Sequence, residues 1–597
     1  MVKPMDLKKI AVIIILVLLL LSAANAIYAK DHEYSIKNAN IDLTVQKDGM
    51  LLVNENYHYS FEGTFNGVYR DISLKSGQNI SNLQVHVDGA YSTYKLEEHN
   101  GKPRIVVYLW ADEAHTQKIH DQDVKISYSY NMQNVVTLYD DVGMLQYKLW
   151  GEDWDCPVER VTADIHLPGD KDNIYYLNPS YYNSSDSING NTIHVVSTKI
   201  PKGQFYELTA LMPLDDFSNA PYALHLHENA KDKIISEINS YKNGVNFWGN
   251  LFNIFTGLCI ISPLSLIFVY LKYGREPKVD YYGIYERELP TDDSPAVVNA
   301  LLNRSNIGKP NMEGFEATIM DLIDRKIFKM RIESSEHLED LILELDDSRY
   351  NELSVDEKSV FDLLETFSYN NVLNVSKLSS KLNNEANGKL FVKKLDEWKD
   401  IVEKQRIGED KISEYFNDKG TTISSFFGFG GLVIAAAFFL IAAFSKHPAA
   451  MWTMFASVFL GIVSIAILML PEDILGHWTP EGRVYYLKWM NFKKFLKDNS
   501  LIKEHPPESI VIWNKYLVYG TALGVAEEVY KSMKLYEPSV SDDDYHYSDL
   551  YRFHSYSGLI MLNSAFNTGI SASNPSSDGG GFGGVGGGSG GGGGGAF

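Results

Sequence analysis

The sequence predicts a multi-domain membrane protein, with an extracytoplasmic antiparallel β-sandwich, three transmembrane α-helices, a cytoplasmic winged-helix-like α+β domain and a disordered Gly-rich C-terminus. Three observations lead to this prediction. Apolar and polar residues alternate over short runs in the N-terminal third, which is typical of strands. Three later runs are apolar and long enough to cross about 30 Å of hydrocarbon. The other segments show helical spacing, and 597 residues are too many for one hydrophobic core.

The first 26 residues have the three parts of a secretory signal peptide. Basic residues precede an apolar run at residues 10–21, and Ala24 and Ala26 follow as an A-x-A cleavage site. We therefore predict a signal peptide at residues 1–26. An uncleaved anchor helix is the alternative.

Residues 30–220 are the predicted extracytoplasmic domain. A turn at Asp48 and Gly49 precedes residues 51–61, where apolar side chains alternate with polar ones, and residues 124–132 repeat that alternation. Short strands separated by turns favour an antiparallel β-sandwich.

Two motifs in this domain, FEGTFNGVYRDISL and LWGEDWDCPVERV, bring together an arginine, carboxylates and two tryptophans. Such a cluster could bind a cation or a sugar, although no metal-ligand spacing repeats. The structural alternative places the arginine in an ion pair and the tryptophans in the core. An open polar pocket would favour binding, and burial would favour the structural role. The possible exterior ligand cluster comprises Arg70, Trp150, Glu152, Asp153, Trp154 and Asp155.

Three apolar runs, at residues 249–271, 426–444 and 451–470, are the predicted transmembrane helices. A juxtamembrane helix at residues 221–248 leads into the first. None of the three contains Asp, Glu, Lys, Arg or His, which disfavours an ion pump. The second and third are joined by the six residues SKHPAA, so they form an antiparallel hairpin. Small residues suit close contact between its helices: Gly428, Gly430, Gly431, Ala435 and Ala436 facing Ala456 and Gly461.

The distribution of basic residues predicts the orientation of the chain in the cell membrane. Lys272, Arg275 and Lys278 follow the first span, whereas the 15 residues before it carry only Lys242. Because basic residues are enriched on the cytoplasmic side, we expect the mature N-terminus outside and the C-terminus in the cytoplasm.

Residues 275–420 are the predicted cytoplasmic winged-helix-like domain. The stretches ELPTDDSPAVVNALLN and GFEATIMDLIDRK indicate two helices, and a strand at residues 327–332 followed by DLILEL indicates a hairpin. Ser354 and Glu357 have the spacing of a capping box at the start of another helix. Winged helices often bind nucleic acid, but 54 Lys+Arg against 76 Asp+Glu give a net charge of −22, which would repel a polyanion. We expect no nucleic-acid partner.

Residues 478–536 are predicted to form cytoplasmic amphipathic helices. An aromatic stripe surrounded by lysines, directly after a cytoplasmic membrane exit, favours a helix that lies on the anionic inner leaflet. Packing on the winged-helix-like region is the alternative. The predicted membrane-surface residues are Tyr485, Lys488, Trp489, Phe492, Lys493, Lys494, Leu496 and Lys497.

Residues 537–597 are predicted to be a disordered tail, first acidic and then Gly-rich, ending in GGGFGGVGGGSGGGGGGAF. Cys156 and Cys259 are the only cysteines, and they fall in an aqueous domain and a membrane span, so no disulfide is expected. The sequence predicts no cofactor and no metal site.

Several stretches resemble a known family. GTFNGVYRDI, ELPTDDSPAVVNALL, HWTPEGRVYYLKWMNFKKFL, NKYLVYGTALGVAEEV and the Gly-rich end are similar to the bacterial predicted membrane proteins grouped as domain of unknown function 2207. The resemblance implies an integral membrane protein of the bacterial cell envelope. It implies no catalytic residues.

These observations lead to a functional hypothesis and an alternative. The hypothesis is a non-enzymatic scaffold or signal-passing protein that links an exterior β-domain to a cytoplasmic interaction domain. Its expected partners are the lipid bilayer and unidentified proteins, and no small-molecule substrate is evident. The alternative is an enzyme or an accessory subunit of a transport or envelope-assembly complex, with an exterior binding site.

Overall fold

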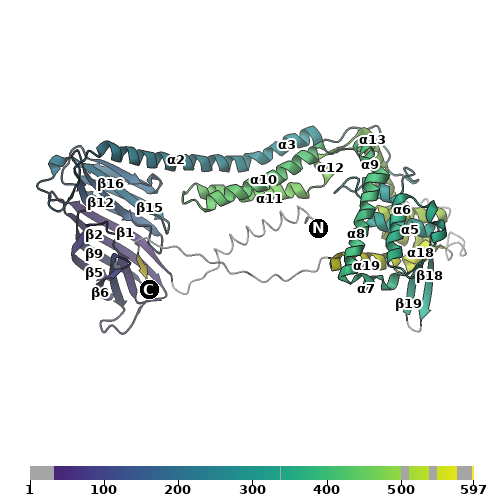
Figure 1. Cartoon of the computed structure of the whole chain (residues 1–597), viewed down its shortest axis with the longest axis horizontal. Helices are drawn as coiled ribbons and strands as arrows, with labels where there is room; N and C mark the ends of the chain where they lie inside the picture. Colours follow the sequence, from purple (N-terminus) through teal and green to yellow (C-terminus); the bar gives the residue numbers. More distant parts are fainter. Residues whose placement is uncertain (1–32, 336–337, 499–509, 537–547, 574–593) are drawn as a thin grey trace. The chain divides into compact units, whose positions relative to one another are not determined.

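The computed structural model describes residues 33–335, 338–498, 510–536, 548–573 and 594–597 (Figure 1). The predicted signal peptide lies outside the described residues. The chain divides into two compact units. The strand-rich unit contains residues up to Ile260, residues Ile434–Phe459 and the C-terminus, and the helical unit contains Ile261–Val433 and Leu460–Phe582.

The strand-rich unit is built from several sheets around one hydrophobic core. The largest sheet has the order β14 (Asn183–Asn189), β15 (Thr192–Ile200), β12 (Val158–His166), β1 (Glu33–Val45), β2 (Leu51–Glu62), β9 (Asp123–Gln133) and β5 (Asn79–Asp88). A second has the order β13 (Ile174–Asn178), β16 (Tyr206–Met212), β11 (Gly143–Trp150), β10 (Val136–Leu138) and β17 (Leu224–His225). A third has the order β23 (Gly594–Ala596), β4 (Gly67–Asp71), β7 (Lys102–Trp110) and β6 (Tyr91–His99), and β3 (Thr64–Phe65) pairs with β8 (Ile119–His120).

The alternation read from the sequence is present in β2. Its odd-numbered residues from Leu51 to Phe61 are buried, and their neighbours are at least partly exposed. The turn before it also matches, because Gly49 has φ of +83°, a conformation that glycine adopts without strain. The prediction of a large β-rich N-terminal region is therefore confirmed.

The prediction that all strand pairs are antiparallel is wrong. Strand β1 pairs with β2 in antiparallel fashion through the hairpin, but its other neighbour, β12, runs parallel to it from Ile36 and Val158 to Thr44 and His166. Strands β10 and β17 are also parallel. A long excursion of the chain separates β1 from β12, so no short turn imposes an antiparallel direction.

Among the described residues, three helices are long and apolar enough to cross a membrane. The first is the continuous helical stretch Lys231–Gly274, made of α2 (Lys231–Ile261), η3 (Ser262–Leu264), α3 (Ser265–Val269) and η4 (Tyr270–Gly274). The others are α10 (Lys419–Ala443) and α11 (Ala450–Met469). The predicted juxtamembrane helix and first span are thus one helical stretch that begins at Lys231.

The helical unit begins with α4 (Pro295–Leu301) and α5 (Met312–Asp324), followed by the hairpin of β18 (Phe328–Ser335) and β19 (Leu338–Leu345). The expected helix, helix, hairpin order is present, and β20 (Val372–Asn374) completes the sheet. The predicted capping box at Ser354 and Glu357 is confirmed. The later elements are η5 (Asp347–Glu352), α6 (Val355–Thr366), α7 (Val375–Leu382), α8 (Glu385–Ile401), η6 (Val402–Ile407), α9 (Gly408–Tyr415), β21 (Phe416–Asn417), α12 (Glu472–Leu475), β22 (His477–Trp478), α13 (Pro480–Lys497), α15 (Ile510–Ala522), α16 (Ala526–Tyr536), α18 (Asp549–Ser555) and α19 (Gly558–Ser573).

The prediction of a disordered tail over residues 537–597 is wrong in two places. Helices α18 and α19 occupy residues 549–555 and 558–573, and the side chains of Leu562 and Phe566 on α19 are fully buried. The last residues form strand β23, which is drawn in yellow beside the purple strands in Figure 1. Residues 537–547 and 574–593 lie outside the described residues.

Small residues allow α10 and α11 to pack closely, but not every small residue that the sequence analysis named lies at the contact. A Cβ added at Gly431 would lie 2.3 Å from Ser464 Oγ, and one at Gly428 would lie 2.6 Å from Leu468 Cγ. Gly430 has no atom within 4 Å of the same position. The face that contains Gly428 and Gly431 is therefore the contact face of α10.

Replacing Gly431 by leucine is expected to destabilise the hairpin by about 1–3 kcal/mol, because the larger side chain overlaps Ser464. Gly430→Leu is the matched control, since the same side chain would enter open space. Thermal unfolding of the two purified variants in detergent measures the difference. Equal melting temperatures would contradict this contact face.

Candidate functional site

The Arg70 side chain is held in an ion pair inside the strand-rich unit. Its Nε and Nη2 atoms donate to the two carboxylate oxygens of Glu55, each at 3.1 Å, and its Nη1 donates to the Asp71 carbonyl at 2.6 Å. Glu55 is 1% exposed and also accepts from Tyr147 Oη at 3.0 Å. Burial acts to lower the pKa of Arg70, but attraction to Glu55 outweighs it and keeps that pKa above its ordinary value.

The two tryptophans of the predicted ligand cluster are core residues. Trp150 and Trp154 are 1% and 2% exposed, and their rings are stacked with centroids 4.5 Å apart. The Arg70 guanidinium carbon lies 5.3 Å from the Trp154 ring centroid. Together with the Arg70 ion pair, this burial is the outcome expected of the structural alternative. Neither Trp150 nor Trp154 therefore presents its ring to a ligand in solvent.

The carboxylates of the cluster have separate partners. Glu152 accepts from Lys148 Nζ at 2.7 Å, Asp153 lies 3.5 Å from Lys102 Nζ, and Asp155 accepts from Tyr69 Oη at 2.7 Å. Burial acts to raise the pKa of Glu152, but its hydrogen bond from Lys148 holds that pKa below its ordinary value. Within the described part of the chain, no group of three His, Cys, Asp or Glu residues could hold a metal ion.

A cavity of about 270 Å³ lies beside the Arg70 ion pair. It brings Arg70 and Glu152 together, but not Asp153, Trp154 or Asp155. The sequence analysis did not single out the other polar residues that line it, among them Tyr147 and Glu207, nor Glu55 beside it. The signal for Glu55 was available, because it is a carboxylate at a buried position of an alternating strand, where only a paired charge is stable.

A second cavity, of about 530 Å³, lies where the α10–α11 loop meets the strand-rich unit. Aromatic residues line it, and the His447 ring in the loop lies 5.0 Å from the Tyr181 ring. Lys446 Nζ donates to the Gly203 carbonyl at 3.1 Å. Burial lowers the pKa of His447. The loop between the second and third spans is thus packed against the strand-rich domain.

The other end of the hairpin forms hydrogen bonds and an ion pair within the helical unit. Thr421 Oγ1 on α10 donates to the Glu472 carbonyl at 2.8 Å, and Arg304 Nε donates to Asp473 Oδ2 at 2.5 Å. The Ile307 backbone N–H donates to Glu472 Oε2 at 2.9 Å. The residues of the hairpin are therefore shared between the two units, and each part has contacts within its own unit.

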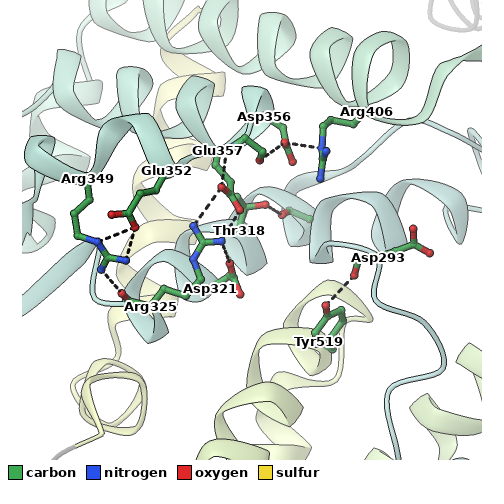
Figure 2. A network of polar contacts seen from close by, with 12 residues as sticks. Asp293, Thr318, Asp321, Arg325, Arg349, Glu352, Asp356, Glu357, Arg406 and Tyr519 are labelled. Carbon is green, nitrogen blue, oxygen red and sulfur yellow. Dashed lines mark hydrogen bonds and ion pairs between the residues drawn. The ribbon is translucent and has the colours of Figure 1, made fainter.

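Figure 2 shows a polar network in the helical unit. Arg325, directly after α5, donates to both oxygens of Glu357 on α6, at 2.7 and 3.2 Å, and lies 3.2 Å from Asp321 on α5. Burial raises the pKa of Asp321 to about 6, although Arg325 opposes that rise. Asp356, also on α6, pairs with Arg406 at 2.9 Å. The network joins three helical elements and has a structural role.

The predicted membrane-surface helix is present as α13, but its aromatic stripe faces protein. Tyr485, Trp489, Phe492 and Leu496 are buried in the core of the helical unit. The Trp489 ring stacks on Tyr519 of α15 with centroids 5.4 Å apart. The membrane-surface prediction is therefore wrong for this stripe. Of the lysines around it, Lys494 and Lys497 are exposed, Lys488 and Lys493 are partly buried, and burial lowers the pKa of Lys493.

Glu316 is a buried carboxylate that the sequence analysis did not single out. It lies on α5, is 3% exposed, and accepts from Asn563 Nδ2 of α19 at 3.0 Å. Burial raises its pKa to about 7, which the Asn563 hydrogen bond partly offsets.

These features define an integral membrane protein with a β-rich N-terminal domain and three apolar helices. The chain belongs to the predicted membrane protein family DUF2207. Its N-terminal domain model matches residues 35–212, and its C-terminal domain model matches residues 282–533. The family match confirms the resemblance noted in the sequence.

Other comparisons give only distant likenesses. No curated protein matches the chain. An M1 zinc metallopeptidase from Deinococcus radiodurans is 10% identical, with 30% of this chain and 42% of that chain covered and a TM-score of 0.20. A putative protease from Parabacteroides distasonis is 13% identical, with 30% and 40% covered and a TM-score of 0.20. Native yeast LTA4 hydrolase is 11% identical, with 90% and 92% covered and a TM-score of 0.23.

The raised pKa of Glu316 predicts a pH-dependent stability. A carboxyl whose folded pKa is about 7 and whose ordinary value is 4.5 reduces the free energy of unfolding as pH rises between those values. Glu316→Gln should remove this effect, so the variant gains up to about 3 kcal/mol relative to the natural chain between pH 5 and pH 8. Unfolding by denaturant at both pH values measures it.

Glu409→Gln is the control, because Glu409 lies in the same helical unit and is exposed. Its stability relative to the natural chain should not change with pH. A constant difference between Glu316→Gln and the natural chain would show that Glu316 is ionised in the folded protein.

Proposed function

We propose that this protein is a non-enzymatic scaffold or signal-passing component of the bacterial cell envelope. In this proposal the signal peptide at residues 1–26 directs the strand-rich domain to the exterior, and the helical domain, which we interpret as winged-helix-like, stays in the cytoplasm. The helical domain then acts through protein contacts, since the net charge of −22 opposes nucleic acid.

The observation that carries the proposal is the pair of contacts made by the α10–α11 hairpin. Its outer loop packs on the strand-rich domain through Lys446 and His447, and its inner end is hydrogen-bonded to the helical domain through Glu472 and Asp473. In this proposal, the hairpin is the physical connection across the bilayer, because its residues have contacts within both units.

The cavity beside Arg70 supports the alternative function. Its volume of about 270 Å³ suits a small polar ligand on the exterior side, and so does its charged lining of Arg70, Lys75, Lys148, Glu152 and Glu207. This would be an accessory or enzymatic role in a transport or envelope-assembly complex. The Arg70–Glu55 pair is already fully engaged, so the structural role of these residues remains the better supported one.

The proposed orientation can be tested by labelling single cysteines. Tyr94→Cys places a thiol on the exposed surface of β6, and Tyr369→Cys places one on the exposed surface of the helical domain. A membrane-impermeant maleimide added to intact cells or spheroplasts should label only the first, and permeabilised cells should show both. The native cysteines give little background, since both are buried and burial raises the pKa of Cys156 to about 11. Labelling of Tyr369→Cys in intact cells would overturn the orientation.

Signal passing through the hairpin predicts coupling between its two ends. Lys446→Ala combined with His447→Ala removes the outer contact, and amide hydrogen exchange at residues 472–478 should then become several-fold faster in the purified full chain. Trp452→Ala is the control, because this side chain is exposed on the same hairpin. Unchanged exchange at residues 472–478 in the double variant would leave the hairpin as an anchor only.

A further inference from the structure

The cavity beside the α10–α11 loop is bounded on one side by a single face of α2. The α2 residues that line it recur at the three- and four-residue intervals of one helix face. They are Tyr241, Gly244, Val245, Trp248 and Phe252. The end of α10, the loop after it and Tyr181 provide the other walls. All of these residues belong to the strand-rich unit, so the cavity lies within one compact part of the molecule.

The lining of this cavity is mainly aromatic and apolar. Phe252 is 1% exposed and packs in a small buried cluster with alanines of the hairpin. Its ring centroid lies 6.0 Å from the Trp248 ring and 6.0 Å from the His447 ring. Other lining side chains remain exposed, since Trp248 is 48% and Phe444 is 86% exposed. The cavity therefore presents apolar surface that the protein itself does not cover.

The position of the cavity along the spans indicates what meets this surface. Phe444 ends the apolar run at residues 426–444, and Trp248 directly precedes the run at residues 249–271. These are points at which two candidate spans leave the hydrocarbon. Tryptophan and tyrosine are enriched at that level of a bilayer, and both residue types line the cavity. Exposed apolar surface at this level is in contact with the acyl chains of membrane lipids.

The charges at the cavity favour an anionic lipid headgroup. Among the described residues that line it, none is Asp or Glu, although the whole chain has a net charge of −22. Lys446 lines the cavity and is exposed, and its Nζ donates to the Gly203 carbonyl at 3.1 Å. A lysine ammonium has three donors, so two remain for the phosphate oxygens of a lipid.

We propose that this cavity binds one acyl chain of an anionic phospholipid, with the lipid phosphate at Lys446. Its volume of about 530 Å³ lies within the range of about 300–1,000 Å³ that is usual for ligand cavities. The inference goes beyond the proposed function and does not depend on the orientation, because both leaflets of a bilayer contain phospholipid. A lipid in this position contacts α2, the hairpin and the strand-rich domain together, so it connects their packing to the lipid composition of the membrane.

Photolabelling of the full chain in lipid nanodiscs tests the site. The nanodiscs are made of phosphatidylcholine with a trace of phosphatidylglycerol that carries a diazirine on one acyl chain. After illumination, peptide mass spectrometry should find the label on residues 241–252 and 441–444. Added unlabelled phosphatidylglycerol should displace this label, whereas the same amount of zwitterionic phosphatidylethanolamine should not.

Two glycine variants of α2 locate the label. A Cβ added at Gly244 has no atom within 4 Å, so Gly244→Phe would enter the cavity without overlapping the protein and should abolish the displaceable label. Gly257→Phe is the matched control, because its Cβ also has no atom within 4 Å and Gly257 does not line the cavity. Melting temperatures of both variants in detergent check that they fold.

Lys446→Gln tests the headgroup contact, since it keeps the length of the side chain and removes its charge. The advantage of phosphatidylglycerol over phosphatidylethanolamine as competitor should fall about fivefold, the contribution of one lysine near anionic lipid.

The outcomes separate the two parts of the proposal. Label that phosphatidylglycerol does not displace, or that Gly244→Phe leaves unchanged, would mean that lipid meets only the outer surface of the spans, and would overturn the site. Equal displacement by the two competitors, or an unchanged preference in Lys446→Gln, would overturn the anionic headgroup. If Gly244→Phe does not fold, displacement from the natural chain still decides the result.

Discussion

Satisfaction of backbone hydrogen bonds is the constraint on which both halves of this structure depend. In hydrocarbon a peptide group has no water to bind, so the chain crosses only as helix. The three candidate spans obey this rule, and the apolar runs within them, at residues 249–271, 426–444 and 451–470, carry no charged side chain. The first span contains Pro263, which has no N–H, and the helix narrows there to the 3-10 turn Ser262–Leu264. Ser265 Oγ donates to the Ser262 carbonyl at 2.6 Å, which satisfies one of the groups affected by that turn.

The same constraint explains the β4 edge in water. A strand edge left open attracts any extended segment. Strand β23 fills this edge, where the amides of Asn66 and Gly67 donate to Phe597 and the Tyr69–Asp155 pair lies close to Gly595. Asp155 belongs to the acidic motif that the sequence singled out as a possible ligand cluster. Asp155 lies against the backbone of Gly595, and a Cβ at that position would lie only 2.5 Å from Asp155 Oδ2. Glycine therefore allows this close approach.

Residue patterns predicted the elements of this fold better than their surroundings. Alternation located β2 and its buried face, but strand period is the same for parallel and antiparallel neighbours, so the parallel pairing of β1 with β12 was not visible. The aromatic stripe on α13 correctly indicated an amphipathic helix. Helical period cannot tell whether such a stripe meets lipid or protein, and Trp489 meets Tyr519 of α15. The candidate site was predicted in part: Arg70 is paired as the structural alternative required, while its partner Glu55 was overlooked among alternating residues.

Contact at both ends of the α10–α11 hairpin is necessary for signal passing and is not sufficient. A ligand shifts a conformational equilibrium only by the difference between its affinities for the two states. The strand-rich unit meets the structural part of this requirement, since the β4 edge and the loop contact at His447 belong to the same compact unit. Strand β23 pairs with backbone groups of β4 that would otherwise be unpaired, and its Gly595 lies close to Asp155. Asp155 in turn lies 3.7 Å from Lys202. The next residue, Gly203, accepts a hydrogen bond from Lys446. The Asp155–Lys202 ion pair thus links the strand pairing at β4 to the loop contact at Gly203 within one compact unit.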